Sequence, residues 1–154
     1  MNARYAAALV SIAAFACALP ALAEVTVRDA WVRGTVAGQK VTGAFMQLSS
    51  TSDATLVAAS TPNAKFVEIH EMKQEGDVMK MKAIDRLALP AGKSVALTPG
   101  GYHMMLFDLK APLHVGDVVS LTLTFEDSQG KKSTVEVKAT VKALSAGAMP
   151  TAKP

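Results

Sequence analysis

A chain of 154 residues is long enough for one domain with a substantial hydrophobic core, but not for two. Half of the residues are hydrophobic, and the formal net charge is only +3. The charges are well mixed and form no basic stripe, so nucleic acid is not an expected partner.

The first 23 residues are predicted to be a signal peptide that is removed after export. Arg4 gives a weakly basic start, Ala6 to Leu19 is an apolar run, and Ala21-Leu22-Ala23 fits the small-x-small cleavage rule. The apolar run is too short to span a bilayer, which needs about 20 residues, and no later run is longer. We therefore expect a soluble periplasmic protein that begins at Glu24 and has no stable membrane insertion.

The only cysteine, Cys17, lies within that predicted signal peptide. Cysteine zinc sites, thiol exchange and blue-copper centres all require a thiolate, so they are excluded from the mature protein. A lipoprotein signal that uses Cys17 is the weaker alternative, because Ala14 stands where such signals usually carry leucine.

The chain after Glu24 predicts about eight to ten short strands, separated by turn signals at intervals of roughly 8 to 12 residues. No segment has a convincing amphipathic helical pattern, so an all-β sandwich or Greek-key barrel is favoured over residues 24–144. The last residues, 145–154, are rich in Ala, Gly and Pro and are predicted to be a disordered tail. The strands are expected at 24–33, 41–49, 54–59, 65–72, 78–84, 86–89, 94–97, 103–109, 118–125 and 133–144.

Two early residues are assigned to the core. Trp31 follows the alternating Val25 and Val27 and is predicted to anchor the core from the first strand. Met46 lies between Ala44 and Leu48 on one face of the second strand, and we interpret it as core filler.

Two histidines and four methionines in the middle of the chain form three pairs, each with its members two residues apart. They are His70 with Met72, Met79 with Met81, and His103 with Met105. In a strand, residues at i and i+2 point to the same face. Three strands could therefore direct six imidazole and thioether groups to one place.

The first two pairs flank a predicted hairpin loop, Gln74-Glu75-Gly76-Asp77, in which Gly supplies a positive φ. A hairpin centred in that loop places His70 opposite Met81 and Met72 opposite Met79, with all four on one face. A slip of one residue would separate them.

The third pair follows Thr98-Pro99-Gly100-Gly101, where Pro at the second position and Gly at the third suit a type II turn. In the strand after this turn, His103 and Met105 share a face. Met104 and Leu106 then point to the other face and into the core.

Each pair alone is compatible with ordinary packing, because methionine fills gaps well. Three converging pairs favour a metal site. Thioethers bind zinc, calcium and magnesium poorly but suit Cu(I), as imidazole does. Outside the cytoplasm a thioether also does not oxidise to a disulfide. The mixed donor set therefore indicates copper.

The spacing His70-x10-Met81-x21-His103-x-Met105 resembles the signature of the periplasmic copper chaperone family PCuAC. The resemblance covers most of the mature chain and implies a cupredoxin-like β-sandwich. Further stretches that look like this family are 30–33, 67–72, 79–81, 99–106 and 121–126.

The resemblance implies a non-enzymatic carrier of one Cu(I) per monomer, which supplies the dinuclear copper centre of cytochrome c oxidase. Its partner would be oxidase subunit II or a thiol-containing assembly factor. The tail has Met149 but no histidine, so the Cu(II) site of some relatives is not predicted. The implied ligands are His70, Met81, His103 and Met105. Met72 and Met79 would be neighbours that either surround these ligands or hold the ion during transfer.

His114 falls in a turn outside this pattern, and we expect it on the surface. Two alternatives to a chaperone stay open. One is a general copper buffer or resistance protein that uses the same site, and the other is a structural sandwich whose methionines are core. An enzyme is not favoured, because the mature sequence shows no nucleophile motif and no thiol.

Overall fold

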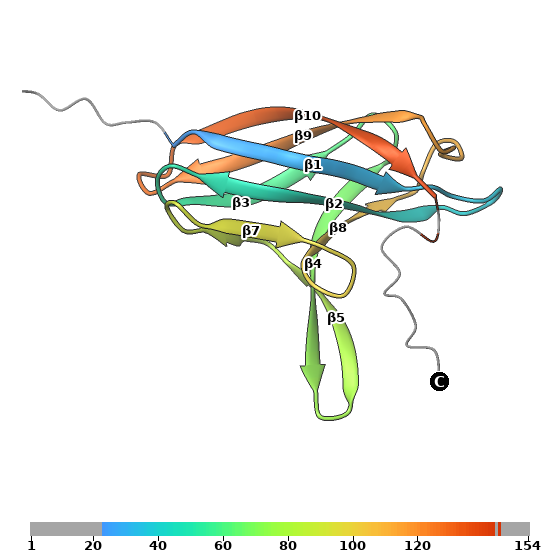
Figure 1. The fold of residues 1–154 in the computed structure, drawn as a ribbon, viewed down its shortest axis with the longest axis horizontal. Helices are drawn as coiled ribbons and strands as arrows, with labels where there is room; N and C mark the ends of the chain where they lie inside the picture. Colours follow the sequence, from blue (N-terminus) through green and yellow to red (C-terminus); the bar gives the residue numbers. More distant parts are fainter. Residues whose placement is uncertain (1–22, 144, 146–154) are drawn as a thin grey trace, which may run out of the picture.

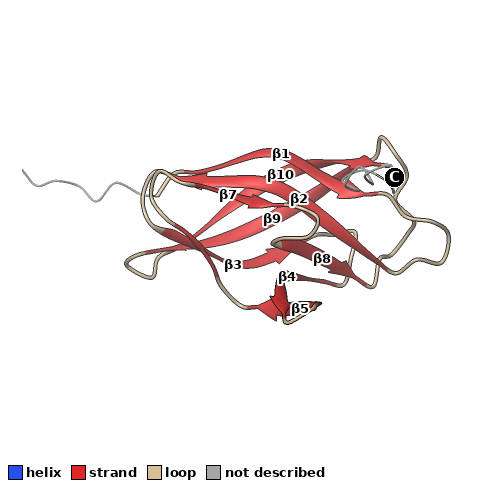
Figure 2. Cartoon of the chain, turned by 60° about the horizontal axis from the view of Figure 1, so that its bottom comes forward, coloured by secondary structure: helices blue, strands red, loops and turns tan. Residues whose placement is uncertain are grey.

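The computed structural model describes residues 23–143 and 145, and within them it has ten strands and no helix (Figures 1 and 2). The predicted all-β fold is confirmed. The predicted signal peptide and tail lie outside the described residues, apart from Ala23 and Ser145. The strands are β1 Val25–Arg33, β2 Val41–Ser50, β3 Ala54–Ser60, β4 Phe66–Glu75, β5 Val78–Ile84, β6 Leu87–Leu89, β7 Ser94–Leu97, β8 His103–Phe107, β9 Val118–Asp127 and β10 Lys132–Lys142.

The strands form one open sheet in the order β5-β4-β8-β2-β1-β10-β9-β3-β6, with β7 paired to β2. Neighbouring strands run antiparallel except β1 and β10, which are parallel. The sheet folds over so that β3 comes close to β4, and the two halves enclose one core. None of the described residues forms a helix long and apolar enough to cross a membrane.

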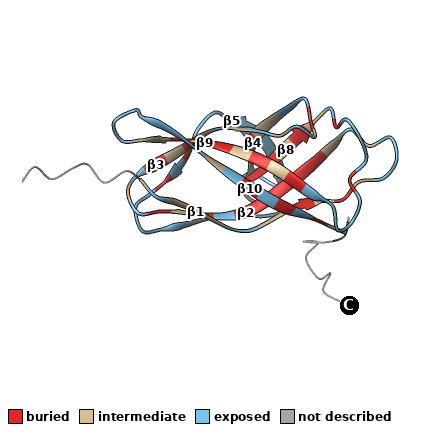
Figure 3. Ribbon diagram, turned by 90° about the horizontal axis from the view of Figure 1, so that it is seen from above, coloured by how far each residue is buried: buried red, intermediate tan, exposed pale blue. Residues whose placement is uncertain are grey.

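Buried and less buried residues alternate along β9 and β10, as they should where one face of a sheet covers the core (Figure 3). Leu121, Leu123 and Phe125 of β9 are fully buried, whereas the threonines between them are not. Met46 on β2 is also buried, as predicted for core filler.

The first strand contains a bulge that overturns the prediction for Trp31. Asp29 has φ of 52°, and the pairing of β1 with β2 shifts between Arg28 and Trp31. A bulge adds one residue and reverses the alternation of faces beyond it. As a result Val32 reaches the core, while Trp31 is only half-buried on the outer face.

On that outer face Trp31 stacks on Phe45 of β2, with ring centroids 4.4 Å apart. The ring of Phe45 folds back over Gly43, where a Cβ would lie 2.8 Å from the Phe45 Cζ atom. Gly43 is therefore needed for the ring to occupy this place.

The β4–β5 hairpin differs from the predicted register by two residues along β5. Glu75 is opposite Val78, so the loop is the two residues Gly76 and Asp77, with Gly76 at φ of 64°. Glycine with positive φ at the first central position suits a two-residue hairpin turn. The face of every side chain is kept, but the partners change: Met72 is opposite Met81, His70 opposite Ala83, and Met79 opposite Gln74.

The turn before β8 agrees with the prediction. Gly101 N–H donates to the Thr98 carbonyl over 3.0 Å, and Gly100 has φ of 86°, as a type II turn requires. Met104 and Leu106 are fully buried. Strand β8 ends at Phe107, earlier than predicted, because Asp108 has φ of 54° and leaves the extended conformation.

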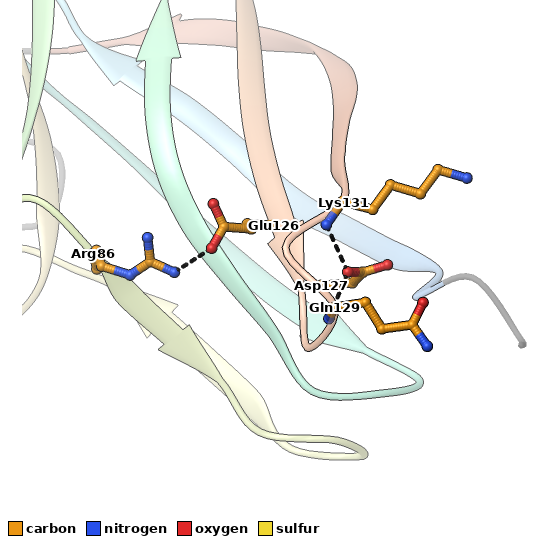
Figure 4. A network of polar contacts seen from close by, with 5 residues as sticks. All are labelled: Arg86, Glu126, Asp127, Gln129 and Lys131. Atoms are coloured by element: carbon orange, nitrogen blue, oxygen red, sulfur yellow. Dashed lines mark hydrogen bonds and ion pairs between the residues drawn. The ribbon is translucent and has the colours of Figure 1, made fainter.

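At the end of the sandwich that does not carry the histidines, polar contacts fix the β9–β10 turn and link Arg86 to β9 (Figure 4). The Asp127 carboxylate accepts hydrogen bonds from the backbone of Gln129 and Lys131 and so fixes the β9–β10 turn. Arg86 donates to Glu126 over 2.7 Å, and this guanidinium holds the pKa of the Glu126 carboxyl below its usual value.

Gly43→Ala is expected to displace the Phe45 ring and to lower the free energy of unfolding by about 1–3 kcal/mol, the usual cost of overpacking. Trp31 is the only tryptophan in the chain, so its fluorescence reports the lost stacking. Gln47→Ala, at an exposed position of β2, is the control. An unchanged emission spectrum in Gly43→Ala would contradict this packing.

Candidate metal site

The two histidines face each other across the pairing of β4 with β8. His70 is directly opposite His103, and their ring centroids are 5.6 Å apart. Their neighbours Ile69 and Met104 point into the core, so both imidazoles stand on the outer face of the sheet. Each histidine is nevertheless only 7% exposed.

Contacts of His103 determine which of its nitrogens is free. Its Nδ1 lies 3.0 Å from the Gly101 carbonyl, which can only accept a hydrogen bond. In the neutral ring Nδ1 therefore carries the proton, and Nε2 keeps a lone pair. That Nε2 lies 3.3 Å from the Sδ atom of Met81, so an imidazole and a thioether donor point at the same space.

His70 presents its other nitrogen. Its Nε2 lies 2.8 Å from a carboxylate oxygen of Glu68, so the neutral ring donates from Nε2 and keeps a lone pair on Nδ1. Nδ1 is buried and has no hydrogen-bond partner among the described residues. A buried acceptor without a partner is costly, and a bound ion would satisfy it.

The methionines surround this pair at different depths. Met81 is 52% exposed at the end of the sheet. Met105 shares a face with His103 and lines with it a cavity of about 330 Å³, to which Met72 also contributes. Met79 is 50% exposed and lies two cross-strand pairs nearer the hairpin tip than Met81. The structure thus places His103 beside both His70 and the Met81 sulfur, and Met105 lines a cavity with His103 that neither His70 nor Met81 lines.

Three residues near the site were not predicted from the sequence. Glu68 orients His70, Phe45 lies with its ring 6.4 Å from that of His103, and Arg33 places its guanidinium 5.4 Å from the Phe45 ring. Phe45 and Arg33 line the cavity. Glu68 could have been found, because it lies two residues before His70 and so shares its face.

Burial keeps His103 in its neutral form. Loss of hydration is the largest cause that lowers the pKa of His103 below 6.5, and it outweighs the hydrogen bond to Gly101, which raises it. The nearby His70 and Arg33 lower this pKa further. The ring is thus available as an electron-pair donor at neutral pH.

The chemistry of the donors restricts the metal. Over residues 23–143, no three His, Cys, Asp or Glu side chains are grouped as they would be for a hard or borderline divalent ion. Two imidazoles and neighbouring thioethers form an uncharged set instead. Such a set suits a soft monovalent ion.

Residues 25–141 match the model of the lipoprotein LpqE-like family. The chain belongs to the LpqE-like family. A curated protein of Leifsonia xyli subsp. xyli that is named as a lipoprotein, Lxx21020, is 35% identical to this LpqE-like chain over 144 residues, or 86% of each chain.

Solved structures share the fold of this LpqE-like protein. The solution structure of Cu(I)-loaded DR1885 from Deinococcus radiodurans is 34% identical, with a TM-score of 0.54, and covers 84% of this chain and 83% of its own. The copper-bound PCuAC domain of PmoF2 is 22% identical, with a TM-score of 0.62, and covers 77% of this chain and 92% of its own. The predicted PCuAC-like fold is confirmed.

The apoprotein is expected to lose stability as the pH falls below 6.5. The pKa of His103 is lower when folded than when unfolded, so the unfolded chain takes up the proton first and is favoured. This loss should continue down to the folded-state pKa and then stop. Urea unfolding of wild type and His103→Gln between pH 8 and pH 5 would measure it.

The substitution His103→Gln should remove part of that pH dependence, whereas Gln47→Ala, which removes no titratable group, should not. His114 lies in an exposed turn, as predicted. Identical pH profiles for wild type and His103→Gln would contradict the assigned shift.

Proposed function

We propose that this protein is an exported metallochaperone that binds one Cu(I) and passes it to an acceptor. The observation that supports it most is the convergence of neutral donors, because the Nδ1 atom of His70 is buried without a partner and the Nε2 atom of His103 faces the Met81 sulfur. The proposed ligands are His70, Met81, His103 and Met105.

Copper is supported by the donor chemistry and by the relatives. Thioether and imidazole together select Cu(I) over zinc, calcium and magnesium. A protein 34% identical to this chain has a Cu(I)-loaded solution structure, and a domain of the same fold has a copper-bound one. An uncharged ligand set binds the monovalent ion without burying a compensating negative charge, so the bound state carries a single positive charge.

The weak hold of thioethers favours delivery. An acceptor with thiolate ligands would bind Cu(I) more strongly than two imidazoles and two thioethers, so transfer runs toward it. We propose the dinuclear copper centre of cytochrome c oxidase as the final destination, reached through oxidase subunit II or a thiol-containing assembly factor. The protein is then a carrier and not an enzyme.

Export follows from the predicted signal peptide at residues 1–23, which leaves a copper-binding domain at 24–144. Because the family and the Leifsonia relative are named as lipoproteins, attachment through Cys17 is the alternative form of the same export. Both forms place the thioether site outside the cytoplasm, and we propose the periplasm as the compartment.

Titration with Cu(I) under reducing conditions, against a competing chelator, tests the proposal. We expect about one equivalent to bind, and the double variant His103→Ala with Met105→Ala to lose more than about 100-fold in affinity, because two ligands are removed. X-ray absorption of the loaded protein should show both nitrogen and sulfur neighbours. His114→Ala is the control, and retention of affinity in the double variant would reject the site.

Glu68 should act on binding through His70. A carboxylate that accepts a hydrogen bond from the other ring N–H of a ligating histidine fixes its tautomer and raises its basicity, and losing such a partner typically costs about 10–100-fold in metal affinity. We therefore expect Glu68→Leu to weaken Cu(I) binding by that amount. Glu68→Gln, which still offers an oxygen acceptor, should lose less, and equal effects of the two variants would contradict the orienting role.

A further inference from the structure

We propose that Met72, Met79 and Met81 form a second, sulfur-only station for Cu(I) on the β4–β5 hairpin, through which the ion enters and leaves. The inference rests on the function proposed above and names the route to that site. It gives Met81 two roles, as a ligand of the buried site and as a member of the station.

The hairpin register brings the three thioethers together. Met72 is directly opposite Met81, and Met79 is two residues from Met81 on the same face, diagonal to Met72. Direct cross-strand partners have Cβ atoms about 5 Å apart and diagonal ones about 7–8 Å, which long side chains can bridge. Methionine has three rotatable bonds, so its sulfur can move toward a shared ion.

Access differs sharply between the two kinds of ligand. Met79 and Met81 are about half exposed, while His70 and His103 are 7% exposed. An incoming donor can therefore reach the methionines but not the imidazoles. Since the Met81 sulfur lies 3.3 Å from the Nε2 atom of His103, Met81 joins the accessible station to the buried site.

The position of the hairpin suits an exchange with a partner. It projects from the body of the sandwich, and β5 is the end strand of the sheet (Figure 1). Every residue of β5 except Ile84 is exposed. An acceptor can thus approach from the side of β5 without displacing any core residue.

The two faces of the hairpin differ in charge. Where β4 pairs with β5, the face with the thioethers carries only uncharged side chains, among them Gln74 and Ala83 beside the methionines. The opposite face holds the charged residues, including the ion pair of Lys80 with Glu75 over 2.6 Å. A cation at the station therefore meets no fixed ammonium group on its own face, and the carboxylate of Glu68 on that face is engaged by His70.

The transfer is a ligand exchange at constant oxidation state. A Cu–S bond to Met79 or Met72 forms as a Cu–N bond to an imidazole breaks, and the nitrogen lone pair is released. A thiolate sulfur of the acceptor then forms its bond to copper as the thioether bonds break. No electron is transferred, and all the ligands supplied by this protein are neutral.

The first test measures rate and affinity separately in the full-length protein loaded with Cu(I). In the variant Met79→Leu, which changes no residue of the cavity around His103, we expect the equilibrium affinity to stay near that of wild type, while transfer to glutathione, used as the thiolate probe, slows several-fold. Gln74→Leu, on the same face, is the matched control. An unchanged rate, or a loss of affinity as large as that in His103→Ala, would overturn the proposal.

The second test removes the buried ligands. His70→Ala with His103→Ala should still bind Cu(I), more weakly and with only sulfur neighbours in X-ray absorption, and adding Met79→Leu should abolish this binding. Failure of the histidine variant to bind would overturn the station alone. Failure of the wild type to show nitrogen neighbours would instead overturn the proposed function.

Discussion

The pairing of β4 with β8 is the constraint on which the site depends. This register sets His70 opposite His103, and the same pairing sends Ile69 and Met104 into the core on the other side. A shift by one residue would move the imidazoles inward and the apolar side chains outward, so burial of the core fixes the geometry of the donors. The free energy that stabilises the sandwich also holds the two imidazole rings beside each other.

Hydrogen bonds to a loop carbonyl and to a strand side chain then determine which nitrogen of each histidine keeps a lone pair. The Gly101 carbonyl, at the end of the type II turn, accepts a hydrogen bond from the N–H of one imidazole, and the Glu68 carboxylate accepts one from the N–H of the other. As a result different nitrogens, Nε2 and Nδ1, are left free on two histidines that face each other. A backbone carbonyl in a turn and a charged side chain thus each fix the tautomer of one histidine.

Much of this was predictable from the sequence, since strand alternation gave the fold class, the buried side of β8 and the shared face of His103 with Met105. The errors have local causes. The hairpin could be centred on either side of Gly76, and only the full set of cross-strand pairs between β4 and β5 distinguishes the two registers. The bulge at Asp29, which turns Trp31 outward, depends on contacts with β2 that no spacing rule describes. The sequence does not single out Glu68, because an acidic residue on a strand is usually solvated surface.

The open edge at β5 has a consequence for how molecules of this protein meet. An end strand with exposed valine and methionine is the kind of surface on which copies can stack into fibres. Here Lys80 and Lys82 occupy alternate positions along the opposite face of that strand. Two copies that paired in antiparallel fashion about Lys80 would bring like ammonium groups together, which disfavours self-assembly while leaving the edge open to a different protein.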